Sequence, residues 1–361
     1  MLFYSARFTA LTSKHTEKVM ANIEVSRVML SDDSNLAGNV HGGTILKLIE
    51  EAGVIVATRH CNKEFQLKKN PECYAALARV ERTDFMEPMF VGEIAQIHAE
   101  MSYTSMHSLE VQCFVFAENV LKGERRLTNR ATLWYVPLTI SSPHSPVSVP
   151  PLTYKTPEDE EAGRVRYETQ KHLRSQQKNT HDEYSAPGQV NVLTPAGRSL
   201  STQHSVSYSQ SSLIVMLHPS DCNKAGFASG GVTMKMMDNV AGIVAFRHCR
   251  SNVVTASVEA VDFHHPVKLG LVMTITGRPV FNSNRSLDIE VFVDCENIVE
   301  GRSFRACSAI FTFVSLDANC KPQPVPELKV DTDAEKLRFE LGRKRYIAKK
   351  GYRKRKIAGD E

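Results

Sequence analysis

The stretch Gly38-Asn39-Val40-His41-Gly42-Gly43 opens directly into an apolar helical segment that runs from Thr44 to Gly53. A second copy of this arrangement lies 188 positions further along the chain, as Gly226-Phe227-Ala228-Ser229-Gly230-Gly231 followed by Val232 to Ala241. Both copies end on the tripeptide Arg-His-Cys, at 59–61 and at 247–249. A repeat of this size indicates two copies of one domain rather than a solenoid.

The repeat continues beyond the helical segments with a displacement of 178 positions, which places one insertion between Asn62 and Cys73 of the first copy. The matched segments are rich in β-branched and aromatic residues and alternate with a period of two, so they are predicted to be strands. The predicted strands are Ala76–Arg82, Glu93–Tyr103, Leu109–Phe116 and Leu127–Val136 in the first copy, and Val254–Phe263, Val272–Phe281, Leu287–Asp294 and Arg305–Ser315 in the second.

Each predicted central helix has one apolar face. The residues on these faces are Leu46, Ile49, Gly53 and Val56 in the first copy and Met234, Met237, Ala241 and Val244 in the second. A single helix wrapped by an antiparallel sheet is the simplest packing that buries such a stripe. The predicted fold class is therefore α+β, with two such helix-and-sheet units in tandem.

The composition shifts along the chain suggest five segments. A leader or targeting segment covers 1–19, the two repeat units cover 20–140 and 205–320, a linker with a charged helix over Glu158–Gln177 covers 141–204, and a charged helix with a basic tail covers 321–361. In the linker helix the acids come early and the bases late, as the helix dipole favours. The basic tail, Arg343 to Lys356, is predicted to be a solvated helix end rather than a nucleic-acid or membrane site.

Cysteine usage and charge limit the class of protein. The chain has 361 residues, a net charge of +4 and eight cysteines without a C-x-x-C pair, and most of these thiols lie within apolar runs. This pattern favours reduced, buried thiols in the cytoplasm over a disulfide framework or a zinc site. Because no acid precedes Glu17, a mitochondrial location remains the alternative. No apolar run reaches the roughly 18 residues of a membrane-spanning helix, so stable membrane insertion is not expected.

The chain resembles the hotdog-fold acyl-CoA thioesterases, and more narrowly the cytosolic, long-chain (brain-type) acyl-CoA hydrolases that carry two hotdog domains in tandem. The resemblance rests on Gly-Asn-Val-His-Gly-Gly and on four longer stretches, which are 76–85, 131–138, 207–213 and 230–235. It implies a tandem double hotdog and an assembly of three chains into a hexamer-like ring, that is, a homo-oligomer. It also implies a long-chain acyl-CoA substrate, with coenzyme A as part of substrate and product and with no separate cofactor.

Thioester hydrolysis needs a group that activates water or attacks the carbonyl, and donors for the developing oxyanion. Backbone amides at Gly42 and Gly43 can approach a ligand closely at a helix start, and His41 can help position substrate. The amide of Asn39 can polarise the carbonyl or orient water. Asp238 has uncharged neighbours on its helix face, which raises its basicity and suits either a general base or a nucleophile. The alternative is a solvated acid on the polar face of the helix, with Lys235 as its neighbour.

The repeat displacement predicts that the two copies are not equivalent. Asn39 corresponds to Phe227, and Asp238 corresponds to Glu50, so each copy holds only one member of the pair. If the turn of one copy faces the helix of the other, one composite site unites Asn39 with Asp238. The opposite site holds Phe227 with Glu50 and is predicted to be inactive. Asn39 and Asp238 are also the positions that resemble the catalytic pair of the family.

The predicted function is hydrolysis of fatty acyl-CoA thioesters without a metal. For coenzyme A, the turn formed by Ser283, Asn284 and Arg285 offers hydroxyls and a cation for phosphate, although an ordinary hairpin turn explains it equally well. A hotdog enoyl-CoA hydratase is the enzymatic alternative, but it would need an acid beside His41 in the loop. A binding module that senses acyl-CoA without turnover is the other alternative.

Overall fold

The computed structural model describes residues 22–35, 38–62, 72–140, 145–184, 197–198 and 201–358. Its described side chains end at 175 in the linker helix and at 350 in the C-terminal helix. The predicted leader 1–19, most of the insertion between Asn62 and Cys73, and the side chains of the basic tail beyond 350 lie outside the described residues. Within the described part, no helix is both long and apolar enough to span a membrane.

The two copies contain the same elements in the same order. The first copy consists of β1 (Asn22–Val28), α2 (Gly42–Cys61), β2 (Cys73–Val80), β3 (Thr83–Phe85), β4 (Ile94–Thr104), β5 (Leu109–Asn119) and β6 (Glu124–Thr139). The second consists of β7 (Ser211–Met216), α6 (Gly230–Cys249), β8 (Asn252–Val258), β9 (Val261–Phe263), β10 (Val272–Asn282), β11 (Ser286–Asn297) and β12 (Arg302–Leu316). Short helices precede the long ones at η1 (Ser31–Asp33), α5 (Val206–Ser209) and η3 (Pro219–Asp221).

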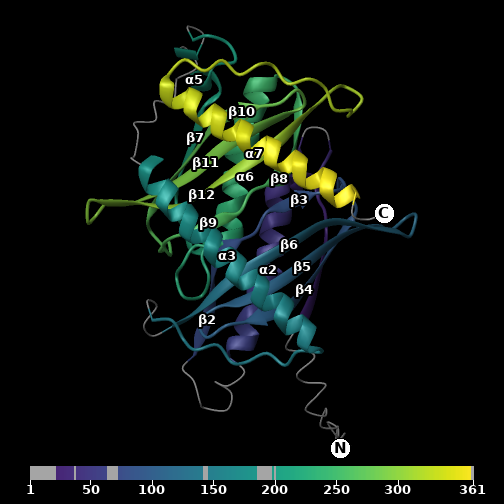
Figure 1. The fold of residues 1–361 in the computed structure, drawn as a ribbon, viewed down its shortest axis with the longest axis vertical. Helices are drawn as coiled ribbons and strands as arrows, with labels where there is room; N and C mark the ends of the chain where they lie inside the picture. The colour runs from purple at the N-terminus through teal and green to yellow at the C-terminus, as the bar shows by residue number, and fades with distance from the viewer. Residues whose placement is uncertain are drawn as a thin grey trace, which may run out of the picture.

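All the strands join one antiparallel sheet of 12 strands that runs through both copies (Figure 1). The strand order is β1-β4-β5-β6-β2-β9-β12-β11-β10-β7, with β3 and β8 paired beside this path. The joint is nearly symmetric: Val80 of β2 pairs with Val261 of β9, and Thr83 of β3 pairs with Val258 of β8. The two copies therefore share one sheet.

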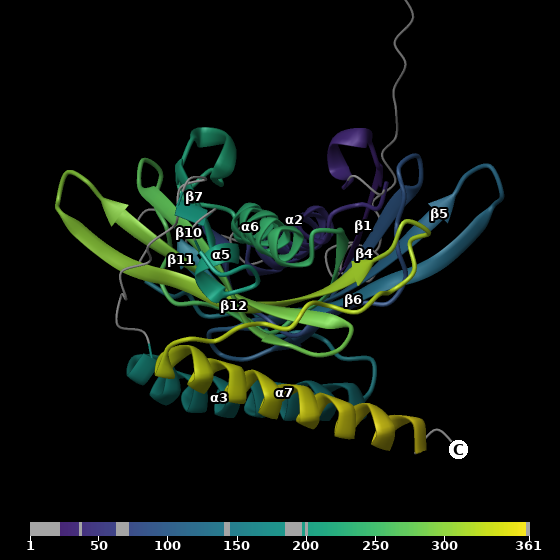
Figure 2. The same cartoon turned by 90° about the horizontal axis from the view of Figure 1, so that it is seen from above.

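The sheet separates two layers of helices (Figure 2). The central helices α2 and α6 lie side by side in the concave face of the curved sheet. The linker helix α3 (Pro157–Tyr184) and the C-terminal helix α7 (Asp333–Ala358) cross the opposite, convex face. This arrangement confirms the predicted fold of an antiparallel sheet wrapped around a central helix, present twice.

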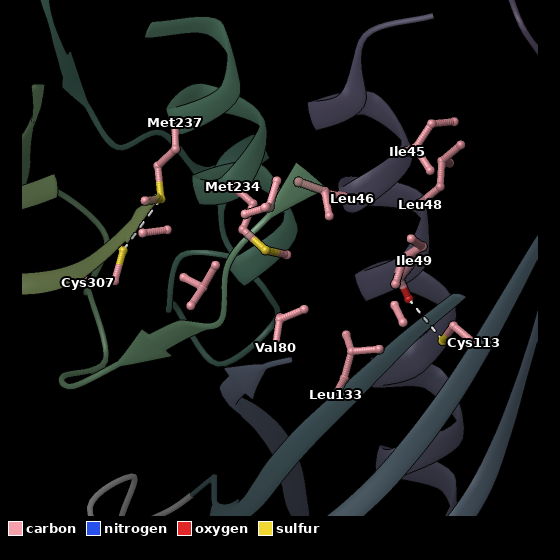
Figure 3. Packing of buried hydrophobic residues seen from close by; sticks show 14 of the residues in the cluster. Ile45, Leu46, Leu48, Ile49, Val80, Cys113, Leu133, Met234, Met237 and Cys307 are labelled. Atoms are coloured by element: carbon pink, nitrogen blue, oxygen red, sulfur yellow. Dashed lines mark hydrogen bonds between the residues drawn. The ribbon is translucent and has the colours of Figure 1, made fainter. Parts of the chain in front are cut away.

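The apolar faces of the central helices form the core between the helices and the sheet (Figure 3). All eight residues predicted for these faces are buried. The cysteines are free, and five of the eight are buried, among them Cys113 against the Ile49 carbonyl and Cys307 against the Met237 sulfur. The predicted burial is thus found for most of the cysteines, whereas Cys320 is exposed.

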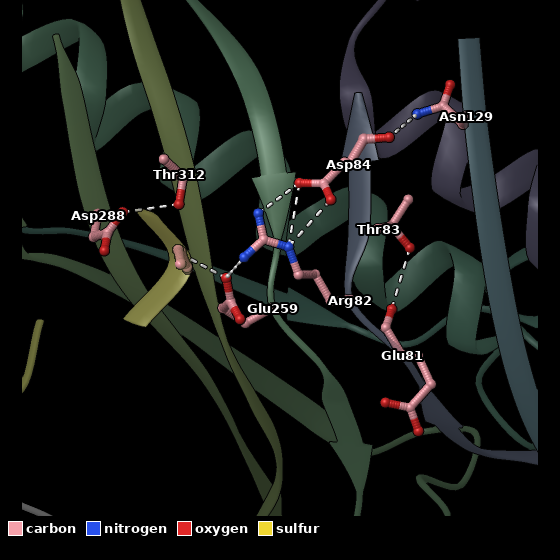
Figure 4. Close-up of polar contacts among 9 residues, drawn as sticks. Glu81, Arg82, Thr83, Asp84, Asn129, Glu259, Asp288 and Thr312 are labelled. Carbon is pink, nitrogen blue, oxygen red and sulfur yellow. Dashed lines mark hydrogen bonds and ion pairs between the residues drawn. The ribbon is translucent and has the colours of Figure 1, made fainter. Parts of the chain in front are cut away.

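Charged side chains form ion pairs at the joint between the two copies (Figure 4). Arg82 next to β3 pairs with Asp84 at 2.6 Å and with Glu259 of the second copy at 3.1 Å. Nearby, the side chain of Arg79 is 1% exposed and contacts Glu81 at 2.7 Å and Asp262 of the second copy at 2.5 Å. Because an unpaired buried charge is strongly destabilising, these pairs favour the observed register between the copies.

Two predicted strands are interrupted at this joint. The predicted strand Val254–Phe263 is divided into β8 and β9, and the predicted Ala76–Arg82 ends at Val80, before β3 begins at Thr83. On both sides of each break the chain pairs with its own copy along one edge and with the other copy along the second edge. Thus β2 pairs with β6 and β9, and β3 pairs with β6 and β8. The linker helix is also longer than the predicted Glu158–Gln177, since α3 extends over Pro157–Tyr184.

Candidate active site

The loop before each central helix has the same backbone structure in both copies. In the first copy, the backbone amide of Asn35 donates to the backbone carbonyl of Asn39 at 2.8 Å, and the backbone amide of Asn39 donates to the side-chain Oδ1 of Asn35 at 3.1 Å. In the second copy, Asn223 and Phe227 make the matching bonds at 2.7 and 3.2 Å. The loops therefore present different side chains, Asn39 and Phe227, from equivalent backbone positions.

The central helices cross so closely that the N-terminus of each faces the middle of the other. The Gly43 amide of α2 donates to Asp238 Oδ2 of α6 at 2.8 Å. A Cβ atom at Gly43 would lie 2.8 Å from the Asp238 Cβ and 2.9 Å from the Lys235 Cα. Glycine is thus required here for the close approach, and the carboxylate lies at the positive end of the α2 dipole.

Asp238 is held at both carboxylate oxygens. Oδ2 accepts the Gly43 amide, and Oδ1 accepts the hydroxyl of Thr255 on β8 at 2.8 Å. The residue is only 2% exposed, and this burial raises the pKa of Asp238 although the bonds from Gly43 and Thr255 act to lower it. A fixed carboxylate with a raised pKa has the properties of a general base.

A cavity of about 880 Å³ opens next to Asp238. Asn39, His41 and Gly42 line it from the first copy, and Asp238 and Thr255 line it from the second. The Asn39 side chain makes no hydrogen bond to another described residue, and neither does the Gly42 amide at the first position of α2. Both are donors available to a ligand at a helix N-terminus. We call the group Asn39, Gly42, Asp238 and Thr255 the open site.

The equivalent group on the other side, Phe227, Gly230, Glu50 and Leu77, is called the filled site. Glu50 accepts the Ser229 hydroxyl at 2.8 Å and the Gly231 amide, and burial raises the pKa of Glu50 to about 6. Leu77 replaces Thr255 and packs against Gly230. Phe227 is 5% exposed and stacks on Tyr74 with ring centroids 5.6 Å apart. Apolar side chains therefore occupy the space that is a cavity in the open site.

The structure brings together most of the residues predicted for the composite site. Asn39, His41, Gly42 and Asp238 line one cavity. On the other side, Glu50 is bonded to Ser229 and Phe227 stacks on Tyr74. Gly43 differs from the expectation that it contacts substrate, because its amide is bonded to Asp238. The predicted coenzyme A turn, Ser283, Asn284 and Arg285, connects β10 to β11 and does not line this cavity.

Thr255 and its counterpart Leu77 were not predicted from the sequence. The displacement of 178 positions pairs them, and it also pairs Asn252, which lines the cavity, with Tyr74, which fills the other site. The sequence does contain a signal for these positions: a polar residue in one copy aligns with an apolar residue in the other, within strands that otherwise match. Among the described residues, no group of three or more His, Cys, Asp or Glu side chains could hold a metal ion.

Comparison with known proteins defines the class first. The sequence profile of the thioesterase superfamily matches residues 37–124 and 225–301, once in each copy, so the chain is a tandem hotdog thioesterase. A solved acyl-CoA hydrolase from Staphylococcus aureus is 27% identical and aligns with a TM-score of 0.40, covering 44% of this chain and 96% of that one.

Curated relatives then define the family. The cytosolic acyl coenzyme A thioester hydrolase of Mus musculus is 50% identical over 353 residues, which are 97% of this chain and 89% of that protein. The protein of the same name from Homo sapiens is 52% identical over 329 residues, which are 91% of this chain and 83% of that protein. The chain belongs to the family of cytosolic acyl-CoA thioester hydrolases.

Proposed function

We propose that the protein hydrolyses long-chain fatty acyl-CoA thioesters to the free fatty acid and coenzyme A at the open site alone. The observation that carries this proposal is the buried Asp238 carboxylate, held by Gly43 and Thr255 beside a cavity that Asn39 also lines. Family membership confirms the predicted class of enzyme, an acyl-CoA thioester hydrolase. The relatives are named cytosolic, in agreement with the predicted cytoplasmic location.

The reaction follows from the positions of these groups. Asp238 takes a proton from a water molecule as the water oxygen attacks the thioester carbonyl carbon. The carbonyl oxygen becomes an oxyanion, which the side-chain amide of Asn39 and the backbone amide of Gly42 stabilise at the positive end of α2. Collapse of the intermediate breaks the carbon–sulfur bond and returns the proton from Asp238 to the departing thiolate. No metal or separate cofactor takes part in this scheme.

One feature favours general-base catalysis by Asp238 over direct nucleophilic attack. Both carboxylate oxygens are fixed by hydrogen bonds, which suits proton transfer better than formation of a bond to the carbonyl carbon. A single turnover in water enriched in oxygen-18 distinguishes the two mechanisms. General-base catalysis places the label only in the fatty acid. Attack by Asp238 forms a mixed anhydride, and water that opens it at the aspartyl carbonyl leaves the label in the aspartate, where mass spectrometry of the peptide detects it. Trapping with hydroxylamine detects an anhydride that water opens at the fatty acyl carbonyl instead.

The hydratase and binding-module alternatives predict different products. The described loop has Asn39 and His41 but no carboxylate of its own, and the carboxylate comes from the other copy. The test incubates the protein with palmitoyl-CoA and with a 2-enoyl-CoA and measures free thiol and hydrated product. Thiol release from palmitoyl-CoA is expected. Hydration without thiol release, or binding without either product, would overturn the proposal.

We also propose that the protein is a homo-oligomer. Exposed apolar pairs occupy the tips of two equivalent hairpins, Val120 and Leu121 between β5 and β6, and Ile298 and Val299 between β11 and β12. Leu121 is 97% exposed and Val299 is 96% exposed, and such apolar tips suit a contact between chains. Sedimentation velocity is expected to show a species of three chains, and substitution of both tips by serine is expected to reduce it.

A further inference from the structure

We propose that the acyl chain of the substrate lies between the C-terminal half of α6 and strand β8, and that Gly242 determines how long a chain this channel accepts. The inference deepens the proposed function and rests on it, because it assumes that the open site binds an acyl-CoA thioester. We call the space between these two elements the α6–β8 seam, and its counterpart in the first copy the α2–β2 seam.

The cavity of the open site is mainly apolar along this seam. Gly242, Ile243 and Phe246 line it from α6, Val253 lines it from β8, and Phe313 and Leu316 line it from β12. Ile243 is 47% exposed and Phe246 is 46% exposed, although both belong to a central helix of the core. Apolar side chains that face a cavity rather than the core indicate an apolar ligand.

Gly242 leaves space that no described residue fills. A Cβ atom there would meet no described atom nearer than the Phe313 ring at 3.9 Å, which is ordinary contact. Its backbone is helical, so neither packing nor conformation requires glycine, and glycine within a helix lowers helix stability. Gly242 follows Asp238 by one helical turn and lies on the same side of α6. The missing side chain therefore widens the cavity directly beyond the catalytic carboxylate.

The α2–β2 seam shows what happens without this space. Val54 takes the place of Gly242, and it packs against the core. Thr58, the counterpart of Phe246, accepts the Ala75 amide at 3.2 Å and so ties α2 to β2. In the α6–β8 seam the corresponding residues, Phe246 and Val253, line the cavity instead. The seam that adjoins the catalytic carboxylate is thus the one that is open.

The lining of the cavity continues along α6 beyond Gly242, as far as Phe246 and Arg247. From Asp238 to Phe246 the helix advances by about 12 Å at 1.5 Å per residue. A short acyl group would end beside Gly242, whereas a palmitoyl chain must pass it. A side chain at 242 should therefore discriminate against long chains, much as one added methyl group in an apolar pocket changes specificity by about 10- to 200-fold.

The test measures kcat/KM for butyryl-, octanoyl- and palmitoyl-CoA with the full-length wild-type protein, Gly242→Ala, Gly242→Val and the matched control Val54→Ala. Gly242→Val is expected to lower the ratio of palmitoyl to butyryl turnover by at least about tenfold, with Gly242→Ala in between. Val54→Ala should leave the ratio unchanged. Thermal unfolding of each variant verifies that it is folded. If Gly242→Val does not fold, Gly242→Ala still tests the channel, because alanine is a good helix former.

An equal reduction for all three chain lengths in a folded Gly242→Val protein would overturn the channel but leave the hydrolase intact. If wild type hydrolyses none of the three, the proposed function fails instead. In that case calorimetric binding of palmitoyl-CoA and of coenzyme A still decides the channel. Weaker binding of palmitoyl-CoA alone to Gly242→Val would support it, and unchanged binding of both would refute it.

Discussion

The open site and the filled site share one backbone and differ in a few side chains. Each has a glycine at a helix start bonded to a carboxylate from the middle of the other central helix. In the open site, Asn39 and Thr255 add polar groups beside a cavity, whereas Phe227, Leu77 and Tyr74 fill the same place on the other side. A carboxylate at a helix N-terminus is therefore common to both, and what distinguishes the sites is access for a ligand and the donors around it.

Substitution of Asp238 is expected to have the largest effect on activity. Asp238→Asn removes the proton acceptor while it retains an oxygen for Gly43 or Thr255, and general-base catalysis is worth about 10²- to 10⁴-fold. Palmitoyl-CoA hydrolysis, followed by thiol release, should fall by about 1000-fold. The matched control is Glu50→Gln in the filled site, which should keep full turnover. Equal losses in both variants would show that the two sites act alike.

Asn39→Ala should have the next largest effect, because it removes a donor for the oxyanion. Loss of one such donor typically lowers kcat by about 10²- to 10³-fold, and a reduction of about 100-fold in kcat is expected here. Phe227→Leu changes the equivalent loop position and should leave kcat within about twofold of wild type, since this position carries no donor. A small effect of Asn39→Ala on kcat with a large effect on KM would instead assign Asn39 to binding.

Thr255→Val should lower activity by about tenfold and change its pH dependence. Burial raises the pKa of Asp238, and the Thr255 hydroxyl counteracts this by stabilising the charged form. Without the hydroxyl the pKa rises further, so the ionised base is lost at a higher pH. The acidic limb of the kcat/KM profile should shift to higher pH, and Thr255→Ser should restore it. An unshifted limb would limit Thr255 to packing.

The smallest expected effect concerns stability at the filled site. Burial raises the pKa of Glu50 from 4.5 to about 6, so the folded protein holds this proton more tightly than the unfolded chain does. The resulting stability is present below about pH 4.5 and is lost as the pH rises through about 6. Glu50→Gln keeps an acceptor for Ser229 and should raise the free energy of unfolding at pH 8 by about 2 kcal/mol.

Urea unfolding at pH 8 and at pH 4 measures this effect, and the difference between Glu50→Gln and wild type should vanish at the lower pH. A constant difference at both values would contradict the assignment to the Glu50 proton. A buried carboxylate in this position is the proposed base at Asp238, whereas at Glu50 its burial lowers the stability of the protein at high pH.

Much of the fold could be predicted because the repeat is visible in the sequence. The displacements of 188 and 178 positions identified two equal units, and the stripes of Leu46 and Met234 identified the buried helix faces. The breaks after Val80 and after Val258 could not be predicted. They lie where the strands pair with the other copy, and local propensity contains no information about that distant partner.

The site was predicted in part for the same reason. Comparison of the copies singled out Asn39 and Asp238, which line one cavity in the structure. The role of Thr255 and the closure by Tyr74 depend on how β8 and β2 lie beside the opposite loop, a tertiary arrangement that periodicity does not fix. Gly43 was expected to face substrate, yet the crossing of the helices gives its amide to Asp238.

The shared sheet has a consequence for stoichiometry. The cavity of the open site takes Asn39 from one copy and Asp238 from the other, so under the proposed function neither copy alone contains a complete site and the pair of copies contains one. A chain with two thioesterase domains should accordingly bind a single equivalent of a non-hydrolysable acyl-CoA analogue. In the proposed oligomer, the number of occupied sites should therefore equal the number of chains, which is half the number of domains.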